Sequence, residues 1–309
     1  MSQLYRGVWR ALQGMSVGDA FGEAVLRTCG TAEQLARRQC PDGPWHHTSG
    51  TVQAAVLMQH LQTNGTIDPD LLVLELAQAY LNDPEREYGS NTRTLLLGVY
   101  EGRPWEELSR KSFAGFGSMG SGAATRVVPL GAYFADDLDV VVEAARLSAR
   151  LTHANNNAIE GAVAVALAVA HFARNETHTH AVWDSLLSRM KPSFTRKRIF
   201  QASKLSYGTS VEAAVEKLGN GRWKCAHDTV PFAIWSALRP SRGYEDSLWN
   251  TAAGQGRSNI LCAIAGGILG AGNRMPSKEW ERRAEAIPAA LMPISREPAV
   301  AYRRSSSSW

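Results

Sequence analysis

Apolar residues recur every three or four positions along most of the chain, the spacing of one buried face on an α-helix. The segment 70–81 is typical, with Leu71, Leu74 and Leu81 on one side. No segment shows sustained alternation of apolar and polar residues, which is the pattern of a half-buried strand. The spacing predicts helices over residues 5–21, 52–61, 70–81, 92–101, 105–110, 138–151, 158–173, 181–190, 211–218, 229–238 and 277–287. Thr48, Ser49 or Thr51 is a candidate cap for the helix 52–61, Asp68-Pro69 is predicted to begin the helix 70–81, and Ser277 to cap the last helix. Pro231 is expected in the first turn of the helix 229–238.

Loops rich in glycine, proline and small polar residues separate these segments. The pattern predicts an all-α fold, one single-domain helical bundle over residues 1–290 with its loops gathered at one end. The segment 291–309 ends in a run of serines, and we expect its end to be a disordered tail. The basic run 195–198 is predicted to be a solvated loop.

The stretch from Gly254 to Gly272 joins a polar turn to a helix of glycine, alanine and large aliphatic residues. Small side chains allow a helix to approach its neighbours closely, so we expect this helix to be central and buried. The turn 255–259 should then open onto a cavity at the helix N-terminus, where unpaired N–H groups favour an anion. It carries Arg257 and Asn259 and no carboxylate.

Composition narrows the class of protein only modestly. The chain has 309 residues, 44% hydrophobic and 20% charged, with a net charge of +4 that is too diffuse to indicate nucleic acid. Its four cysteines form no C-x-x-C pair, which is typical of free thiols in a reducing compartment. We see no apolar leader in residues 1–12, and the most apolar run, 161–172, is too short for a bilayer. We therefore expect a cytoplasmic monomer without membrane or nucleic-acid partners, or an effector delivered to a host cytosol.

Five short motifs and one helix follow one another in a recognisable order. Together they resemble the ADP-ribosylglycohydrolase family, which includes the dinitrogen-reductase-activating glycohydrolases, from about Gly14 to about Gly272. The resemblance implies an all-α fold and a cleft that holds ADP-ribose or an ADP-ribosylated protein. The matching segments are residues 14–23, Thr48-x-x-Thr51, 117–132, 148–153 with Gly161-Ala162, 229–233 and the helix from Cys262.

Two loops set the chain apart from the family it resembles. Family hydrolases hold two magnesium ions on a Thr-Asp-Asp-Thr loop and a late Gly-Asp-x-Asp-Thr loop. Here the first loop reads Thr48-Ser49-Gly50-Thr51, and the second carries Arg257 and Asn259 at the aspartate positions. Magnesium prefers carboxylate oxygens, and Arg257 brings a fixed positive charge. We therefore predict a divergent member with no metal site and no cofactor.

Ligand binding is predicted in the loop 117–126, which is rich in glycine, alanine and serine. Its backbone N–H groups can approach a diphosphate closely. Three residues are candidates for acid–base or charge-stabilising work: Glu23, Asp19 and His153. Each has a structural alternative: Asp19 as an acceptor for loop N–H groups, Glu23 as a surface residue, and His153 as a hydrogen-bonded core residue. The predicted ligand-binding residues are Ser49, Thr51, Gly117, Ser118, Met119, Gly120, Ser121, Gly122, Arg257 and Asn259.

Three functions remain open on the sequence. The first is metal-independent cleavage of ADP-ribosyl groups, with ADP-ribosyl-arginine as the first substrate, by hydrolysis or by a lyase-type reaction. The second is a pseudoenzyme that binds ADP-ribose without turnover. The third is a partner-binding effector or immunity protein that uses only the scaffold.

Overall fold

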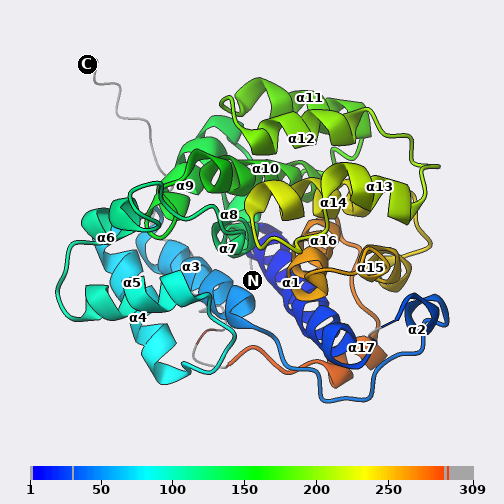
Figure 1. The fold of residues 1–309 in the computed structure, drawn as a ribbon, viewed down its shortest axis with the longest axis horizontal. Coiled ribbons are helices and arrows are strands. Elements are labelled where there is room, and N and C mark those ends of the chain that lie inside the picture. The colour runs from blue at the N-terminus through cyan, green and yellow to red at the C-terminus, as the bar shows by residue number, and fades with distance from the viewer. Residues whose placement is uncertain (1–2, 30, 289–290, 292–309) are drawn as a thin grey trace.

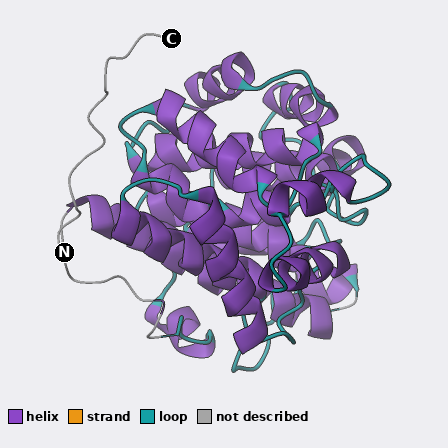
Figure 2. Ribbon diagram, turned by 90° about the vertical axis from the view of Figure 1, so that its left-hand side faces the viewer, coloured by secondary structure: helices purple, strands orange, loops and turns teal. Residues whose placement is uncertain are grey.

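The computed structural model describes residues 3–29, 31–288 and 291, and this part of the chain is built from helices (Figure 2). Two isolated bridges, Trp45 with Ala284 and Gly120 with Cys225, are the β-type pairings found within the described residues. The all-α prediction is confirmed. The segment 292–309, where the tail was predicted, lies outside the described residues.

The helices of the first half run from α1 to α9 (Figure 1): α1 (Gln3–Thr28), α2 (Ala32–Ala36), α3 (Ser49–Asn64), α4 (Pro69–Asn82), α5 (Ser90–Tyr100), α6 (Trp105–Lys111), α7 (Gly122–Arg126), α8 (Val128–Tyr133) and α9 (Leu138–Arg150). Those of the second half are α10 (Asn156–Ala173), α11 (Thr179–Arg189), α12 (Phe194–Ser203), α13 (Val211–Leu218), α14 (Ala226–Leu238), α15 (Tyr244–Ala252), α16 (Ser258–Ala271) and α17 (Lys278–Arg283).

Helices α1 and α16 form the centre of the molecule, packed backbone to backbone. A side chain added at Gly14 or Gly18 of α1 would overlap the carbonyl oxygen of Gly266 or Cys262 on α16. Gly22 stands in the same relation to Ser258, one turn nearer the end of the pair. Nearly every residue of α16 is buried. The prediction of a central helix after the polar turn is therefore confirmed.

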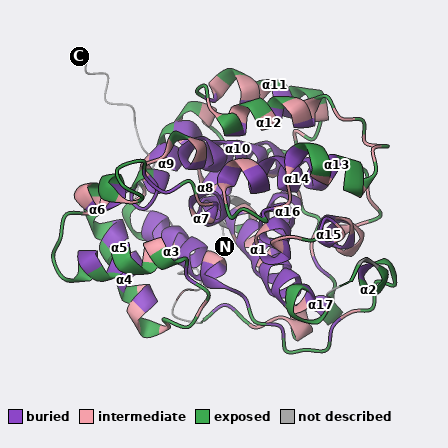
Figure 3. Ribbon diagram, in the orientation of Figure 1, coloured by how far each residue is buried: buried purple, intermediate pink, exposed green. Residues whose placement is uncertain are grey.

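Other apolar helices surround this pair, and Figure 3 shows buried residues concentrated in them. Helix α10 has the length and composition of a membrane span, yet 83% of it is buried inside the fold. It packs against α8, α9 and α14, so burial among other helices accounts for its apolar character.

Several element boundaries differ from the predicted ones. The basic run 195–198 belongs to helix α12, so the predicted loop is wrong there. Ser193 caps this helix by accepting a hydrogen bond from Arg196 N, and Thr195, Ile199 and Ala202 are its buried face. Helices α2, α7, α8 and α15 were also not predicted, and α17 ends at Arg283 rather than 287.

Predicted helix starts are more accurate. Thr48 caps α3 by accepting a hydrogen bond from Gly50 N, and Asp68 caps α4 in front of Pro69. Ser277 caps α17 as expected. Pro231, in contrast, lies inside α14 rather than in its first turn, because the helix begins earlier than predicted, at Ala226.

Candidate functional site

A cavity of about 640 Å³ opens where the N-termini of α3 and α16 meet the loop before α7. We call it the cleft. Most of the predicted ligand-binding residues border it: Ser49, Ser118, Met119, Gly120, Ser121, Gly122, Arg257 and Asn259, with His153 among them. The structure thus brings together the two loops that lack the aspartates of the family pattern, since Ser49 and Asn259 border the same cavity.

Two predicted residues stand behind the cleft wall instead of lining it. Gly117 adopts a left-handed backbone with φ of 70°, and a Cβ there would lie 2.7 Å from Asn155 N. Only glycine therefore fits this close approach of two loops. Thr51 is fully buried in the first turn of α3, where its hydroxyl donates to Asp19 at 2.7 Å.

Asp19 is a buried acceptor beneath the start of α3. Its carboxylate accepts hydrogen bonds from the backbone N–H and hydroxyl groups of both Thr48 and Thr51. Burial raises the pKa of Asp19 to about 6, while the four donors act in the opposite direction. Asp19 does not border the cleft. Its contacts fit the structural alternative, in which it accepts hydrogen bonds from loop N–H groups.

Glu23 lies one helical turn further along α1 and joins that helix to the first turn of α16. One carboxylate oxygen accepts from Arg27 Nε at 2.7 Å, and the other from Asn259 Nδ2 at 3.0 Å. Glu23 is only 8% exposed, so it is not the surface glutamate of the alternative interpretation.

The residues at the expected magnesium loops do not fit that ion. They offer hydroxyl and amide oxygens, and Asn259 spends its Nδ2 on Glu23 and its Oδ1 on Ile260 N. A Cβ at Gly50 would lie 2.9 Å from Thr125 Cγ2, so the loop also lacks room for a side chain. Within the described residues, no group of three or more histidine, cysteine or acidic side chains is placed to hold a metal.

Arg257 precedes the first residue of α16 and borders the cleft. Its Nε is buried and has no hydrogen-bond partner in the described part of the chain. Its backbone N–H donates to Asn220 O at 3.0 Å, which fixes the turn. A guanidinium and the N-terminus of a fourteen-residue helix therefore adjoin one wall, and both attract anions.

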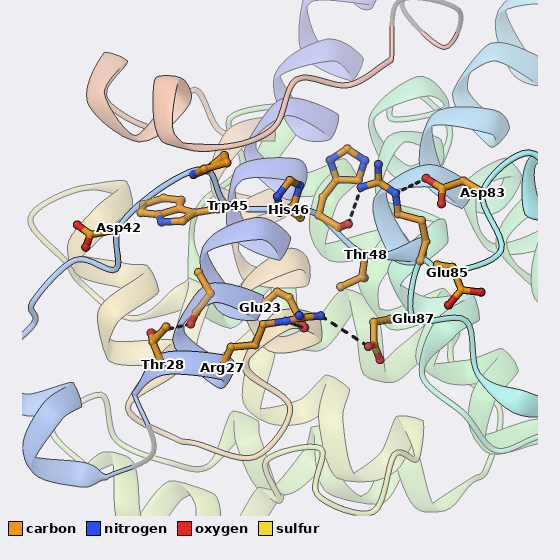
Figure 4. Close-up of a pocket in the computed structure, with 14 residues that line it drawn as sticks. Glu23, Arg27, Thr28, Asp42, Trp45, His46, Thr48, Asp83, Glu85 and Glu87 are labelled. Carbon is orange, nitrogen blue, oxygen red and sulfur yellow. Dashed lines mark hydrogen bonds and ion pairs between the residues drawn. The ribbon is translucent and has the colours of Figure 1, made fainter.

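A second cavity, of about 450 Å³, adjoins the cleft, and both are bordered by Thr48 and Glu87 (Figure 4). Figure 4 shows Arg27 between Glu23 and Glu87, which it approaches to 3.7 Å. Five carboxylate side chains and two arginines border this cavity: Glu23, Asp42, Asp83, Glu85 and Glu87, with Arg27 and Arg86.

Arg86, which borders the second cavity, forms a long-range ion pair that no local sequence pattern predicts. Arg86 grips Glu285 through two hydrogen bonds of 2.6 Å, and this holds the pKa of Glu285 down at about 2. The two neighbouring histidines of this region, His46 and His47, differ in their burial. His46 is exposed, whereas His47 is buried and its pKa falls to about 4 because burial disfavours the charged ring.

Phe113 and Phe116, in the loop before α7, are 61% and 76% exposed, whereas Phe232 and Trp235 are fully buried. Phe113 borders the cleft together with Trp223, which is 75% exposed and was not singled out in the sequence.

Comparison with known proteins finds a matching family and several relatives of this chain. The model of the family described as ADP-ribosylglycohydrolase matches residues 2–289. ADP-ribosylhydrolase ARH3 of Homo sapiens is 29% identical over 274 residues, which cover 78% of this chain and 75% of that protein. An uncharacterized protein of Archaeoglobus fulgidus is 29% identical over 280 residues, or 86% of this chain and 88% of its own.

A solved structure titled ADP-ribosylglycohydrolase-related protein complex has the same fold. It superposes with a TM-score of 0.68 at 22% identity, covering 92% of this chain and 94% of that one.

Proposed function

The chain belongs to the ADP-ribosylglycohydrolase family, and from this premise we propose that its cleft binds ADP-ribosyl groups and acts on them without magnesium. Arg257 carries the proposal, because its guanidinium borders the cleft where the resemblance leads us to expect a carboxylate. Its Nε is buried and has no partner among the described residues, so a shift of the side chain into the cleft would let the guanidinium donate to an oxygen of the diphosphate.

Charge at this position also supports independence from magnesium. A cation held beside a dication is repelled by several kcal/mol at the effective dielectric of a partly buried site. Neutral hydroxyl and amide oxygens do not offset such a loss, since magnesium depends on carboxylates or substrate phosphates for most of its binding.

We propose arginine as the side chain that carries the ADP-ribosyl group. The second cavity supports this choice, because its carboxylates outnumber its arginines by five to two. These carboxylates would attract a guanidinium leaving group. Glu87 borders both cavities and so lies where that group would pass from the cleft into the second cavity.

The proposed reaction breaks the bond between C1″ of the ribose and the arginine nitrogen. Such a bond breaks through an oxocarbenium-like state, which a neighbouring carboxylate stabilises. We assign this role to Glu23. In hydrolysis, water supplies a hydroxyl group to C1″ and the leaving nitrogen takes up the proton; in an elimination the ribose itself would lose a proton to the leaving nitrogen, and no activated water would be needed.

A second candidate function is binding without turnover. It is favoured by the contacts of the two acidic residues, since Asp19 is saturated by donors from α3 and Glu23 is held by Arg27 and Asn259. A carboxylate must leave such partners before it can face a developing positive charge.

Two measurements separate these functions. Calorimetric titration with ADP-ribose in EDTA should show binding, and its absence would leave only a partner-binding role for the scaffold. Release of ADP-ribose from an ADP-ribosylated arginine protein should then proceed equally in EDTA and in magnesium. Binding without release supports the pseudoenzyme, while release only in magnesium overturns the metal-independent proposal.

A further inference from the structure

The last residue of α7, Arg126, is a fully buried cation held by neutral groups. Its guanidinium donates to Ser148 Oγ and Ser148 O, to Gln53 Oε1 at 3.2 Å, and to Thr152 Oγ1 at 3.2 and 3.1 Å. No carboxylate contacts it within the described residues. Burial lowers the pKa of Arg126 to about 10, so the group is still charged at neutral pH. Burying a charge without an ionic partner costs folding free energy.

The hydrogen bonds around Thr152 have only one consistent direction. A guanidinium donates and never accepts, so both lone pairs of the Thr152 hydroxyl oxygen accept, one from Arg126 Nη1 and one from Arg126 Nη2. The hydroxyl proton is then left for His153 Nδ1, which lies 2.7 Å away. Nδ1 is therefore the acceptor nitrogen, and a neutral ring must carry its proton on Nε2.

Nε2 faces the cleft. A Cβ at Gly120 would lie 3.1 Å from this nitrogen, and the closest ring atom to a Cβ at Gly122 would be 3.6 Å away. Two glycines thus leave the ring edge open to the cavity that His153 borders. Burial and the neighbouring Arg126 lower the pKa of His153 to about 3, so the ring is neutral at physiological pH.

We propose that Arg126 is a positioning residue that fixes the Nε2–H tautomer of His153 through Thr152, which makes this ring a permanent hydrogen-bond donor to an anionic oxygen of the ligand. The identity of the ligand as an ADP-ribosyl group rests on the proposed function, whereas the tautomer does not. In this arrangement His153 holds a phosphate oxygen and takes no proton during the reaction.

The same cation orders the opposite wall of the cleft. Because Arg126 only donates, the carbonyl oxygen of Gln53 must face it, and Gln53 Nε2 is turned toward Ser49 O at 3.2 Å. Arg126 therefore connects Ser49 on one side of the cleft with His153 on the other.

The tautomer can be read directly by NMR in the full-length, ligand-free protein. Long-range ¹H–¹⁵N correlations of ¹⁵N-histidine-labelled protein at pH 7 should show His153 protonated on Nε2 and bare on Nδ1. An Nδ1–H tautomer or a protonated ring overturns the proposal. This result does not depend on whether ADP-ribose binds.

Variants of Thr152 test the relay itself. Thr152→Val keeps the shape and removes the hydroxyl, so the tautomer should become mixed and ADP-ribose affinity should fall about tenfold. Thr152→Ser should restore both. Thr251→Val is the matched control: it removes an equally buried hydroxyl, bonded to Ser236 and Ser247, that borders neither cavity.

His153 variants give the complementary result. His153→Gln carries an amide N–H near the position of Nε2–H and should retain most of the affinity, whereas His153→Phe should lose it. Wild-type tautomer and affinity in Thr152→Val would overturn the relay. Lack of ADP-ribose binding by the unmodified protein would defeat the proposed function, while the NMR spectrum would still decide the tautomer.

Discussion

The middle of the α1–α16 pair and its cleft end differ in the contacts that join the two helices. In the middle, Gly14 and Gly18 press directly on the backbone of α16, and no side chain fits between the helices. At the cleft end, Gly22 still packs on the backbone of Ser258, but a side-chain contact is added, because Glu23 accepts a hydrogen bond from Asn259. Four aspartates expected from the family pattern are absent there, yet the fold is intact. The scaffold therefore depends on backbone packing and not on the residues of the site.

The largest effect is expected from a large side chain in the middle of the α1–α16 pair. Gly18→Leu should destabilise the protein by more than about 4 kcal/mol, because the added atoms overlap the Cys262 carbonyl and cannot be accommodated by a rotamer change. Chemical denaturation followed by circular dichroism measures the loss.

The control for that substitution lies on the same helix. A Cβ at Gly7 meets nothing within 4 Å, so Gly7→Ala should be neutral or stabilise α1 by up to about 1 kcal/mol. Equal tolerance at both glycines would contradict the close packing described for the pair.

A smaller effect is expected at the boundary between scaffold and site, where Asp19 is buried. Its pKa is about 6 in the folded protein against 3.8 when exposed, so the folded state binds more protons between these values. The contribution of Asp19 to stability should therefore fall as pH rises from about 4 to 6, by about 3 kcal/mol at most.

Asp19→Asn removes this titration, and the difference between the two stability curves isolates it. The comparison is needed because His47 and His153, whose pKa values are lowered, act in the opposite sense below pH 6.5. A constant difference between wild type and Asp19→Asn from pH 4 to 7 would show that Asp19 does not change its protonation on folding.

A substitution in the cleft should affect binding and leave stability nearly unchanged. Arg257→Gln is expected to weaken ADP-ribose binding about tenfold, with a change in unfolding free energy below about 0.5 kcal/mol. Calorimetry gives the affinity, and the exposed Arg242, which borders neither cavity, supplies the control variant Arg242→Gln. Equal affinity in wild type and Arg257→Gln would remove Arg257 from the proposed site.

The smallest expected effect is the response to magnesium. Thermal melting of the unmodified protein should give the same midpoint in EDTA and in millimolar magnesium, because a ligand that does not bind the native state cannot stabilise it. A midpoint that rises with magnesium concentration would mean that the oxygens of Ser49, Thr51 and Asn259 suffice for a metal after all.

Much of the fold was readable from the sequence because helical periodicity and capping residues are local signals. Asp68-Pro69 and Ser277 marked helix starts correctly for this reason. Helix α12 was missed because its exposed side is basic and only three of its residues are buried, which gave too weak an apolar pattern.

The site was only partly readable for a related reason. Motif order gathered the residues of the cleft, but no local pattern connects Arg86 with Glu285, which lies 199 positions away. The hydrogen-bond direction from Arg126 to His153 likewise depends on which side chains share a buried space, and that information is absent from residue spacing.

The α1–α16 contact also sets an order of events during synthesis. Helix α1 is made first, but the carbonyl groups that its glycines press against belong to residues 258–266, near the end of the described chain. At about 5–20 residues per second, roughly 250 residues of translation separate them by about 12–50 seconds. Throughout that interval the glycines of α1 lack the backbone of α16 against which they pack, although α3 and α8 are already made. The central pair therefore closes only after residues 258–266 have emerged from the ribosome.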